Sequence, residues 1–354
     1  MVEKITDSAI NLLKKLIETP SFSSQEEQTA AHIENWLKSH GIRCNKVNNN
    51  IWAINKHFDE NKPTLLLNSH HDTVKPNNGY TKDPFKAIVE DDKLFGLGSN
   101  DAGGCLVSLM ATFVFFYEHV NLKYNLVLVA SAEEESSGKN GLNSMLAEIP
   151  NIDVAIVGEP TLMNLAVAEK GLVVFDALVK GTPSHAAHPN DDNPIYKLSK
   201  VLKWFEDFSF EKKSNVLEEV KMTVTQINAG KQHNAVPSEV SLVIDVRVND
   251  CYSNQEIADI LILSSPCDSM IPRSLRLNSS SIPIDHELVQ AGISLGRKTY
   301  GSPTLSDQAV LNCPSLKLGP GDSTRSHSAD EFIYVHEIEE GIKIYIDLLN
   351  KVIV

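Results

Sequence analysis

Cysteine is scarce in this chain of 354 residues, and no two cysteines form a Cys-x-x-Cys pair. The five cysteines are odd in number and widely spaced, at Cys44, Cys105, Cys251, Cys267 and Cys313. This spacing argues against a disulfide framework and against a zinc knot built from thiolates. We therefore expect a protein of a reducing compartment.

Positive charge is also in short supply. Lys and Arg number 32 against 46 Asp and Glu, which gives a formal net charge of -14 and a pI of about 5.3. Nucleic acids and anionic membranes are bound by clustered Lys and Arg, so neither is an expected partner. The first twenty residues mix Glu, Lys and Asp with apolar residues, unlike a signal peptide, and the apolar runs look too short to span a membrane. We expect a cytoplasmic protein.

Apolar runs that predict strands alternate with helical segments in the first part of the chain. The predicted strands are 51–55, 64–69, 125–131 and 154–158, and the predicted helices are 5–18, 24–40 and 104–120. Ser24 and Glu27 predict a capping box for the second helix, and Gly41 predicts its end. The alternation favours an α/β fold, with a mostly parallel sheet flanked by helices.

The pattern changes near Leu172 to longer alternating strands, at 172–180, 220–228 and 240–248, with helical segments at 194–207 and 254–263. This pattern predicts an antiparallel α+β insert. Near Ser279 the chain is expected to return to the first domain and to end in a helix at 336–352. The predicted domains are 1–171 and 280–354 for the catalytic part and 172–279 for the insert.

Polar residues follow several of the predicted strands. His70 follows the strand at 64–69, with Asp72 two residues on, and Glu159 follows the strand at 154–158. The carboxylate of Asp72 can orient His70 through its second ring nitrogen, whereas His71 should point away. In an open α/β sheet such residues converge beyond the carboxyl ends of the strands.

Two further candidates lie in glycine-rich segments. Asp101 stands in Gly-Leu-Gly-Ser-Asn-Asp-Ala-Gly-Gly, which lacks the Lys-Ser/Thr pair of a nucleotide loop, and His327 follows Gly-Pro-Gly-Asp. Two histidines and three carboxylates suit two borderline metal ions that share a bridging carboxylate, with zinc as the first choice.

Three consecutive glutamates, Glu133, Glu134 and Glu135, come directly after the strand at 125–131. A charge run of this kind is usually a solvated turn. Its position at a strand end instead favours one carboxylate as a metal ligand and a neighbour that takes a proton from water made acidic by the cations.

Together these segments resemble the dinuclear-zinc aminoacylase and carboxypeptidase family of metallopeptidases, which includes acetylornithine deacetylase, succinyl-diaminopimelate desuccinylase and acetylcitrulline deacetylase. The resemblance spans nearly the whole chain and rests on the order of His-x-Asp, Gly-x-x-Asp, Glu-Glu, Gly-Glu-Pro and a late Gly-Pro-Gly-Asp followed by His. It implies a zinc-peptidase-like catalytic domain interrupted by a ferredoxin-like lid and dimerisation domain. It also implies a cis peptide after Asp101.

The resemblance implies a role for each candidate. His70, Asp101 and Glu159 would hold one divalent ion, zinc or cobalt. Asp101, Glu135 and His327 would hold the other. Glu134 would be the general base, with Asp72 behind His70. The family usually has Asp where this chain has Glu133. That departure leaves a second register open, in which Glu133 is the base and Glu134 the ligand.

Residues of the insert are also assigned by the resemblance. His185 matches a lid histidine that stabilises the oxyanion across a dimer interface, which implies a homodimer. Asn234 and Arg247 match ligands of the substrate carboxylate, and the alternative for Arg247 is a salt bridge with Asp245. Arg325, near His327, lies outside the family motif and could bind the carboxylate of a succinyl chain.

The expected reaction is hydrolysis of the N-acyl bond of an acylated amino acid, a small molecule. The first candidates are N-acetylornithine and N-acylcitrulline, which would place the protein in arginine biosynthesis. N-succinyl-diaminopimelate is an alternative substrate. Di- or aminopeptidase activity with the same two-metal chemistry is another possibility, and a non-enzymatic binding protein with a relict site is the rival from a different class.

Overall fold

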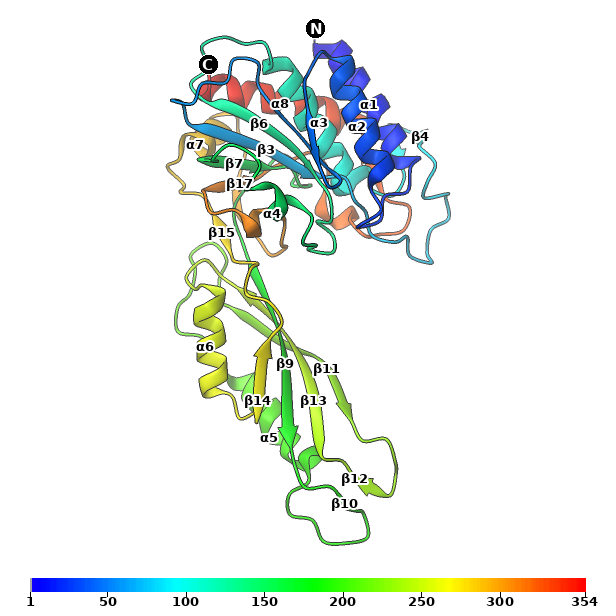
Figure 1. The fold of residues 1–354 in the computed structure, drawn as a ribbon, viewed down its shortest axis with the longest axis vertical. Helices are drawn as coiled ribbons and strands as arrows, with labels where there is room; N and C mark the ends of the chain where they lie inside the picture. Colours follow the sequence, from blue (N-terminus) through cyan, green and yellow to red (C-terminus); the bar gives the residue numbers. More distant parts are fainter. Residues whose placement is uncertain (1) are drawn as a thin grey trace. The chain divides into compact units, whose positions relative to one another are not determined.

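The computed structural model describes residues 2–354, which form two compact units (Figure 1). The first unit contains residues up to Val167, Ser281–Tyr300 and Ser306–Val354. The second contains Ala168–Ser280 together with the short segment Gly301–Leu305, which the sequence pattern had placed in the catalytic domain.

The first unit is built on a mixed sheet whose centre is parallel. In spatial order its strands are β1 (Asn45–Val47), β2 (Asn50–Ile54), β6 (Asn125–Ser131), β3 (Thr64–His70), β7 (Val154–Val157), β17 (Ser315–Lys317), β8 (Leu165–Glu169) and β15 (Ser280–Ser281), with β16 (Thr299–Ser302) beside β8. The central strands pair in parallel, in the order β6, β3, β7 and β17. The flanking pairs β1–β2, β2–β6 and β17–β8 are antiparallel. The predicted α/β class is confirmed, with antiparallel strands added at the flanks.

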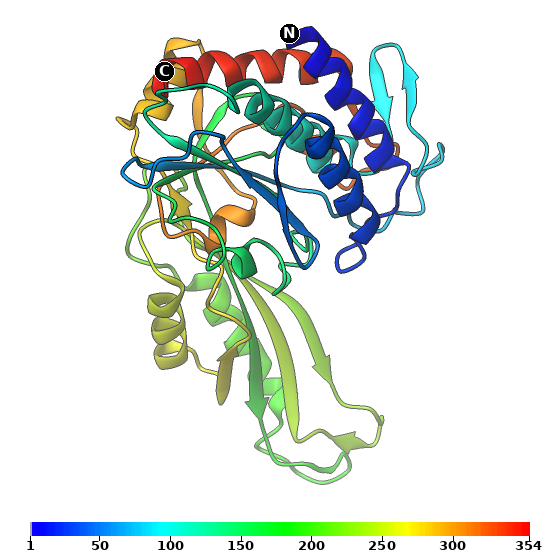
Figure 2. The same ribbon diagram turned by 45° about the horizontal axis from the view of Figure 1, so that its top comes forward.

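Both faces of this sheet are covered. The helices of the unit are α1 (Val2–Ile17), α2 (Glu27–Ser39), α3 (Gly104–Phe116), α4 (Leu142–Met145), α7 (Glu287–Ser294) and α8 (Val335–Val352). Leu65 and Leu67 of β3 point into the large core formed with α1, α3 and α8, which lie side by side in both views (Figure 1 and Figure 2). Leu66 points to the other face, where it packs with α4. The alternation follows from the two-residue period of a strand.

Helix α3 and the turn before it are unusually apolar. By length and composition the stretch Ser99–Phe116 could cross a membrane, contrary to the expectation from sequence, but 83% of it is buried inside the protein. Burial on nearly all sides is what a central core helix requires. The apolar character of α3 is therefore explained by its contacts with α1, α8 and β3.

The predicted start of the second helix is wrong. Helix α2 is preceded by Glu26 as its N-cap residue, and no side chain caps it. Ser24 has a φ of 70° and donates its hydroxyl to Glu133 at 2.9 Å, so it is not available to cap the helix. Gly41, with a φ of 74°, lies just after the helix, as predicted.

The second unit contains a four-stranded antiparallel sheet in the order β11 (Lys221–Ala229), β13 (Glu239–Val248), β9 (Gly171–Lys180) and β14 (Ser269–Pro272). Helices α5 (Pro194–Asp207) and α6 (Asn254–Ser264) follow β9 and β13 in the chain, which gives a ferredoxin-like order. Phe175 and Ile244 on one face of the sheet share a core with Phe205 and Leu261 of the helices.

Two small sheets complete the fold. Strands β10 (Ser184–His185) and β12 (Ala235–Val236) pair in the second unit, and β18 (Phe332–Tyr334), β5 (Lys93–Phe95) and β4 (Ile88–Glu90) form a three-stranded sheet in the first.

Candidate metal centre

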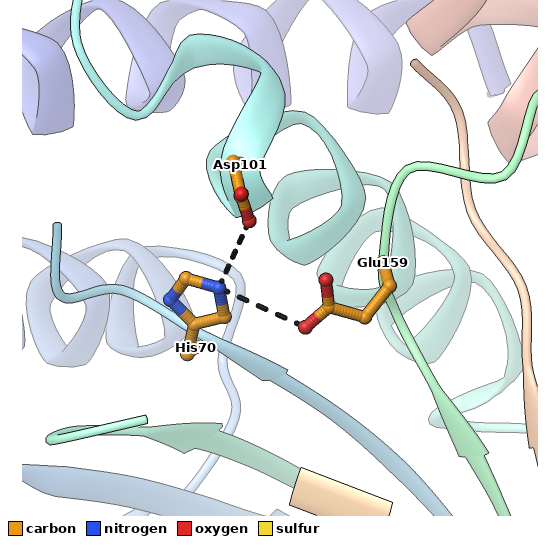
Figure 3. A group of neighbouring side chains, drawn as sticks. All are labelled: His70, Asp101 and Glu159. Carbon is orange, nitrogen blue, oxygen red and sulfur yellow. Dashed lines mark hydrogen bonds and ion pairs between the residues drawn. The ribbon is translucent and has the colours of Figure 1, made fainter. Parts of the chain in front are cut away.

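Adjacent parallel strands bring His70 and Glu159 together. His70 is the last residue of β3, and Glu159 follows β7 by two residues. The buried Nε2 atom of His70 lies 3.3 Å from Oδ1 of Asp101 and 3.8 Å from Oε1 of Glu159 (Figure 3). These three side chains form the first candidate metal group.

Asp101 lies in a tight turn, Ser99–Gly103, directly before α3, and its φ of -117° and ψ of 100° are not helical. The Asp101–Ala102 peptide is cis, as the resemblance implied. Gly98 opens this turn with a φ of 75°, and a Cβ atom there would lie 2.6 Å from Cγ2 of Thr73. Glycine is thus required for the turn that presents Asp101.

A second candidate group shares Asp101. Nε2 of His327 lies 3.0 Å from Oε2 of Glu135 and 3.6 Å from Oδ2 of Asp101. The ligand atoms of each group all lie within 4.8 Å of one another. Because Oδ1 of Asp101 faces His70 and Oδ2 faces His327, this carboxylate is placed to bridge two cations.

The turn after β6 separates the roles of its three glutamates. Oε2 of Glu134 lies 3.9 Å from Nε2 of His70, and Glu135 is part of the second group. Glu133 has a φ of 55° and accepts hydrogen bonds from the side chains of Ser24 and Asn140. This geometry favours Glu134 and Glu135 over the other register.

Asp72 links His70 to the glutamate turn. Its carboxylate accepts hydrogen bonds from the backbone N–H of Glu134 at 3.0 Å, the backbone N–H of Glu135 at 3.1 Å and the hydroxyl of Ser23 at 2.7 Å. Nδ1 of His70 lies 3.0 Å from the carbonyl oxygen of Asp72 and 3.4 Å from its carboxylate. The backbone carbonyl is therefore the closer partner of His70, where the sequence had predicted the carboxylate.

His71 faces away from both groups. Its ring nitrogens lie 2.9 Å from Oγ1 of Thr29 and 3.0 Å from the carbonyl oxygen of Asn49. Burial lowers its pKa to about 4. His71 is thus a neutral structural histidine, and the choice of His70 from the His-His pair agrees with its position.

Burial and neighbouring carboxylates disfavour ionisation of Glu134 and Glu159. Burial and the carboxylate of Asp101 raise the pKa of Glu159 to about 8, and burial raises the pKa of Glu134 well above its usual range. The hydrogen bond to Glu135 raises the pKa of His327 to about 9. Cations bound among these groups would relieve that repulsion. Imidazole nitrogens with carboxylate oxygens also suit a borderline ion such as zinc, so the residues fit a two-cation centre.

The guanidinium of Arg325 is paired with a carboxylate of the protein, that of Glu337. Its two terminal nitrogens donate to the carboxylate of Glu337 at 2.7 and 2.9 Å, and its guanidinium lies 4.9 Å from the ring centroid of Phe332. The predicted contact with a substrate carboxylate would require the pair with Glu337 to open.

The second unit brings two of its three predicted residues together. His185 of β10 pairs with Ala235 of β12, next to Asn234, and both predicted side chains are exposed. Arg247 lies toward the other end of β13 and donates to Asp245 at 2.8 and 3.1 Å. The ion pair that was the alternative for Arg247 is therefore present.

Two carboxyl side chains of the first unit, those of Asp307 and Glu331, were missed from sequence. Asp307 accepts a hydrogen bond from Ser131 at the end of β6, and burial raises its pKa to about 6. Glu331 is 1% exposed and lies four residues after His327. Glu331 could have been noticed from its place four residues after His327, whereas Asp307 reaches the site through its contact with the distant Ser131, which no local sequence pattern indicates.

Comparisons with known proteins agree with this geometry. The sequence profile of Peptidase family M20/M25/M40 matches residues 66–351. The succinyl-diaminopimelate desuccinylase of Rickettsia felis is 24% identical over 383 residues, covering 97% of this chain and 100% of that protein.

Solved structures show the same fold. An M20 family metallo-carboxypeptidase from Sulfolobus solfataricus has a TM-score of 0.75 at 15% identity, with 97% of this chain and 98% of that chain covered. A dinuclear metal-binding M20 peptidase from Bacillus subtilis has a TM-score of 0.75 at 16% identity, with 98% of each covered. Because the family profile matches most of the sequence, the chain belongs to Peptidase family M20/M25/M40, a family of metallohydrolases.

Proposed function

We propose that this metallohydrolase removes an acetyl or succinyl group from the nitrogen of an acylated amino acid. N-acetylornithine and N-acylcitrulline are the first candidate substrates, which corresponds to a step in arginine biosynthesis. The observation that carries the proposal is the position of Glu134, whose partly buried carboxylate lies 3.9 Å from His70 beside two candidate metal-ligand groups that share Asp101.

The residues divide the chemistry among them. Two divalent ions, zinc or cobalt, held by the two groups, would polarise the acyl carbonyl and lower the pKa of water. Glu134 takes the proton from the attacking water and later delivers it to the leaving amine, as one carboxylate can do in both steps. Asp72 keeps Glu134 in place because its carboxylate accepts a hydrogen bond from the backbone N–H of Glu134 at 3.0 Å. His185 donates a hydrogen bond to the oxyanion that forms on the acyl carbon.

Homology supports an acylated amino acid as the substrate, but it does not identify the acyl group or the amino acid. The relative from Rickettsia felis is a desuccinylase, which keeps N-succinyl-diaminopimelate as the alternative substrate. The structural similarity to a carboxypeptidase leaves peptidase activity as an alternative function, although at 15% identity that similarity concerns the fold alone. The segment from Thr304 to Ala309 resembles acetylornithine and acetylcitrulline deacetylases, and this resemblance favours ornithine or citrulline.

We also propose that the protein works as a homodimer formed through its second unit. Ile271 of the edge strand β14 is 61% exposed, and Ile262 and Leu263 at the end of the neighbouring helix α6 are 52% and 89% exposed. Apolar side chains beside an unpaired strand edge favour association with another chain. In such a dimer His185 would serve the site of the partner subunit.

A substrate panel tests the proposed function. It contains N-acetylornithine, N-acetylcitrulline, their succinyl counterparts and N-succinyl-diaminopimelate, each assayed with zinc and with cobalt, and an amino-acid anilide and a dipeptide as controls. We expect one acylated ornithine or citrulline to have the highest kcat/KM. A higher kcat/KM for N-succinyl-diaminopimelate would show that the alternative substrate is the correct one. If the protein cleaves the anilide or the dipeptide and does not hydrolyse the acylated amino acids, it is a peptidase.

A further inference from the structure

Two buried carboxylates accept hydrogen bonds from the backbone of turns that carry candidate metal ligands. Asp72 does so for the turn of Glu134 and Glu135. Glu331 does so for the turn of Asp101, and no role in the site has been assigned to it so far. Each oxygen of a carboxyl group that accepts has two lone pairs, so one such side chain can pair with several N–H donors of a turn.

The carboxylate of Glu331 accepts three backbone hydrogen bonds from this one turn. Oε1 accepts from the N–H of Asn100 and of Asp101, both at 2.9 Å, and Oε2 accepts from the N–H of Gly98 at 3.2 Å. The carbonyl oxygen of Glu331 also accepts from the N–H of Gly96 at 3.0 Å. Removing such an acceptor would leave buried N–H groups unpaired, which is costly.

These contacts join two ligand-bearing segments. Glu331 lies four residues after His327, so it connects the loop of His327 to the turn of Asp101. The side chain of Asn100 reinforces the connection by donating to the carbonyl oxygen of Asp322 at 3.0 Å. His70 and Glu159, in contrast, come from the ends of β3 and β7, which are aligned by the pairing of the sheet.

We propose that Glu331 is a positioning residue that fixes the spacing between Asp101 and His327. Its consequence falls mainly on the second metal group, because that group contains both Asp101 and His327, whereas the first group contains only Asp101 of the two. The inference rests on the proposed two-metal function, and it differs from a general role in folding, which would affect both groups alike.

The test is a titration of the metal-free protein with Co²⁺. Binding is measured by calorimetry and by the absorption spectrum of the bound ion. In Glu331→Gln the side chain keeps its size, but an amide NH₂ cannot accept from Gly98. Partners behind metal ligands typically contribute 10- to 100-fold in affinity, so we expect about that loss for one of the two equivalents and less than about threefold for the other.

Asp330→Asn is the matched control. The carboxylate of Asp330, in the same loop, also accepts two backbone hydrogen bonds, from Thr81 at 2.8 Å and Lys82 at 2.9 Å. Neither donor lies in a turn that carries a candidate ligand. Both equivalents should therefore bind this variant with affinities within about threefold of the native protein, below the loss typical of partners behind metal ligands.

Unchanged binding by Glu331→Gln, or equal weakening of both equivalents, would overturn the inference. A native protein that binds fewer than two equivalents would instead contradict the proposed function. Should Glu331→Gln fail to fold by circular dichroism, Glu331→Asp, which keeps the carboxyl group on a shorter side chain, enters the same titration. Selective weakening of one equivalent would again support the inference, and unchanged or equally weakened binding would again overturn it.

Discussion

The two units hold their candidate site residues in different ways. In the first unit the ligands are fixed by strand ends, by a tight turn and by buried carboxylates such as Asp72 and Glu331. In the second unit His185 and Asn234 are exposed, and Arg247 is paired with Asp245. The difference teaches that one chain is sufficient to bring the candidate metal ligands together, whereas the roles proposed for the residues of the second unit depend on substrate and on a second subunit.

Metal removal is expected to have the largest effect. After dialysis against a chelator, activity should fall below about 1% and return with zinc or cobalt, because the cations supply both carbonyl polarisation and acidic water. Measurement of bound metal alongside activity checks this expectation. Activity retained by protein with no bound metal would contradict it, and the first unit would then lose its assigned role.

Replacement of the proton carrier comes next. Glu134→Gln should lower kcat by about 10²- to 10⁴-fold, the usual contribution of a general base, with metal content unchanged. Glu133→Gln is the matched control, since Glu133 binds Ser24 and Asn140 rather than the metal groups. Its loss should stay below the 10²-fold expected for a general base. A larger loss for Glu133→Gln than for Glu134→Gln would favour the other register.

The lid histidine should matter to a smaller degree. His185→Ala is expected to lower kcat by about 10²- to 10³-fold, as loss of an oxyanion donor does, without changing the metal content. Mixing this variant with Glu134→Gln and allowing subunit exchange should restore about a quarter of native activity, since half the dimers then hold one intact site. No recovery despite exchange would place His185 in its own subunit's site, or outside catalysis.

The smallest expected effect concerns stability without metal. Folding raises the pKa of Glu159 from 4.5 to about 8 and that of His327 from 6.5 to about 9. The metal-free folded state therefore holds these protons more tightly than the unfolded chain, and its stability falls as pH rises through these ranges. Metal binding requires both side chains without those protons, so its contribution grows with pH.

Thermal unfolding with and without zinc at pH 6, 7 and 8 checks this expectation. The difference in Tm between the two forms should widen by several degrees over that range. A constant difference would mean that these two groups do not bind the ion.

The candidate metal ligands could be predicted because their positions follow from local rules. His70, Glu159 and Glu135 lie at or shortly after the ends of apolar strands, and Asp101 lies in a glycine-rich turn before an apolar helix. Parallel strands bring such residues to one edge of the sheet whatever the detailed packing.

Contacts between distant segments could not be predicted in the same way. Ser24 looked like a helix cap, but its hydroxyl binds Glu133, more than a hundred residues away. Asp330 and Glu331 look alike in sequence, yet Asp330 is only partly buried and Glu331 is fully buried beneath the turn of Asp101. Short strands such as β8 and β17 were also missed, because strand formation in such segments depends on their neighbours in the sheet.

The central claim is that Asp101 bridges two cations within one chain. Anomalous X-ray diffraction from zinc-loaded crystals tests this claim most directly. We predict two peaks roughly 3.5 to 4 Å apart, the spacing typical of two-metal sites. One peak should contact His70 and Glu159, the other Glu135 and His327, and both Asp101. A single peak, or two peaks that do not share Asp101, would contradict the account.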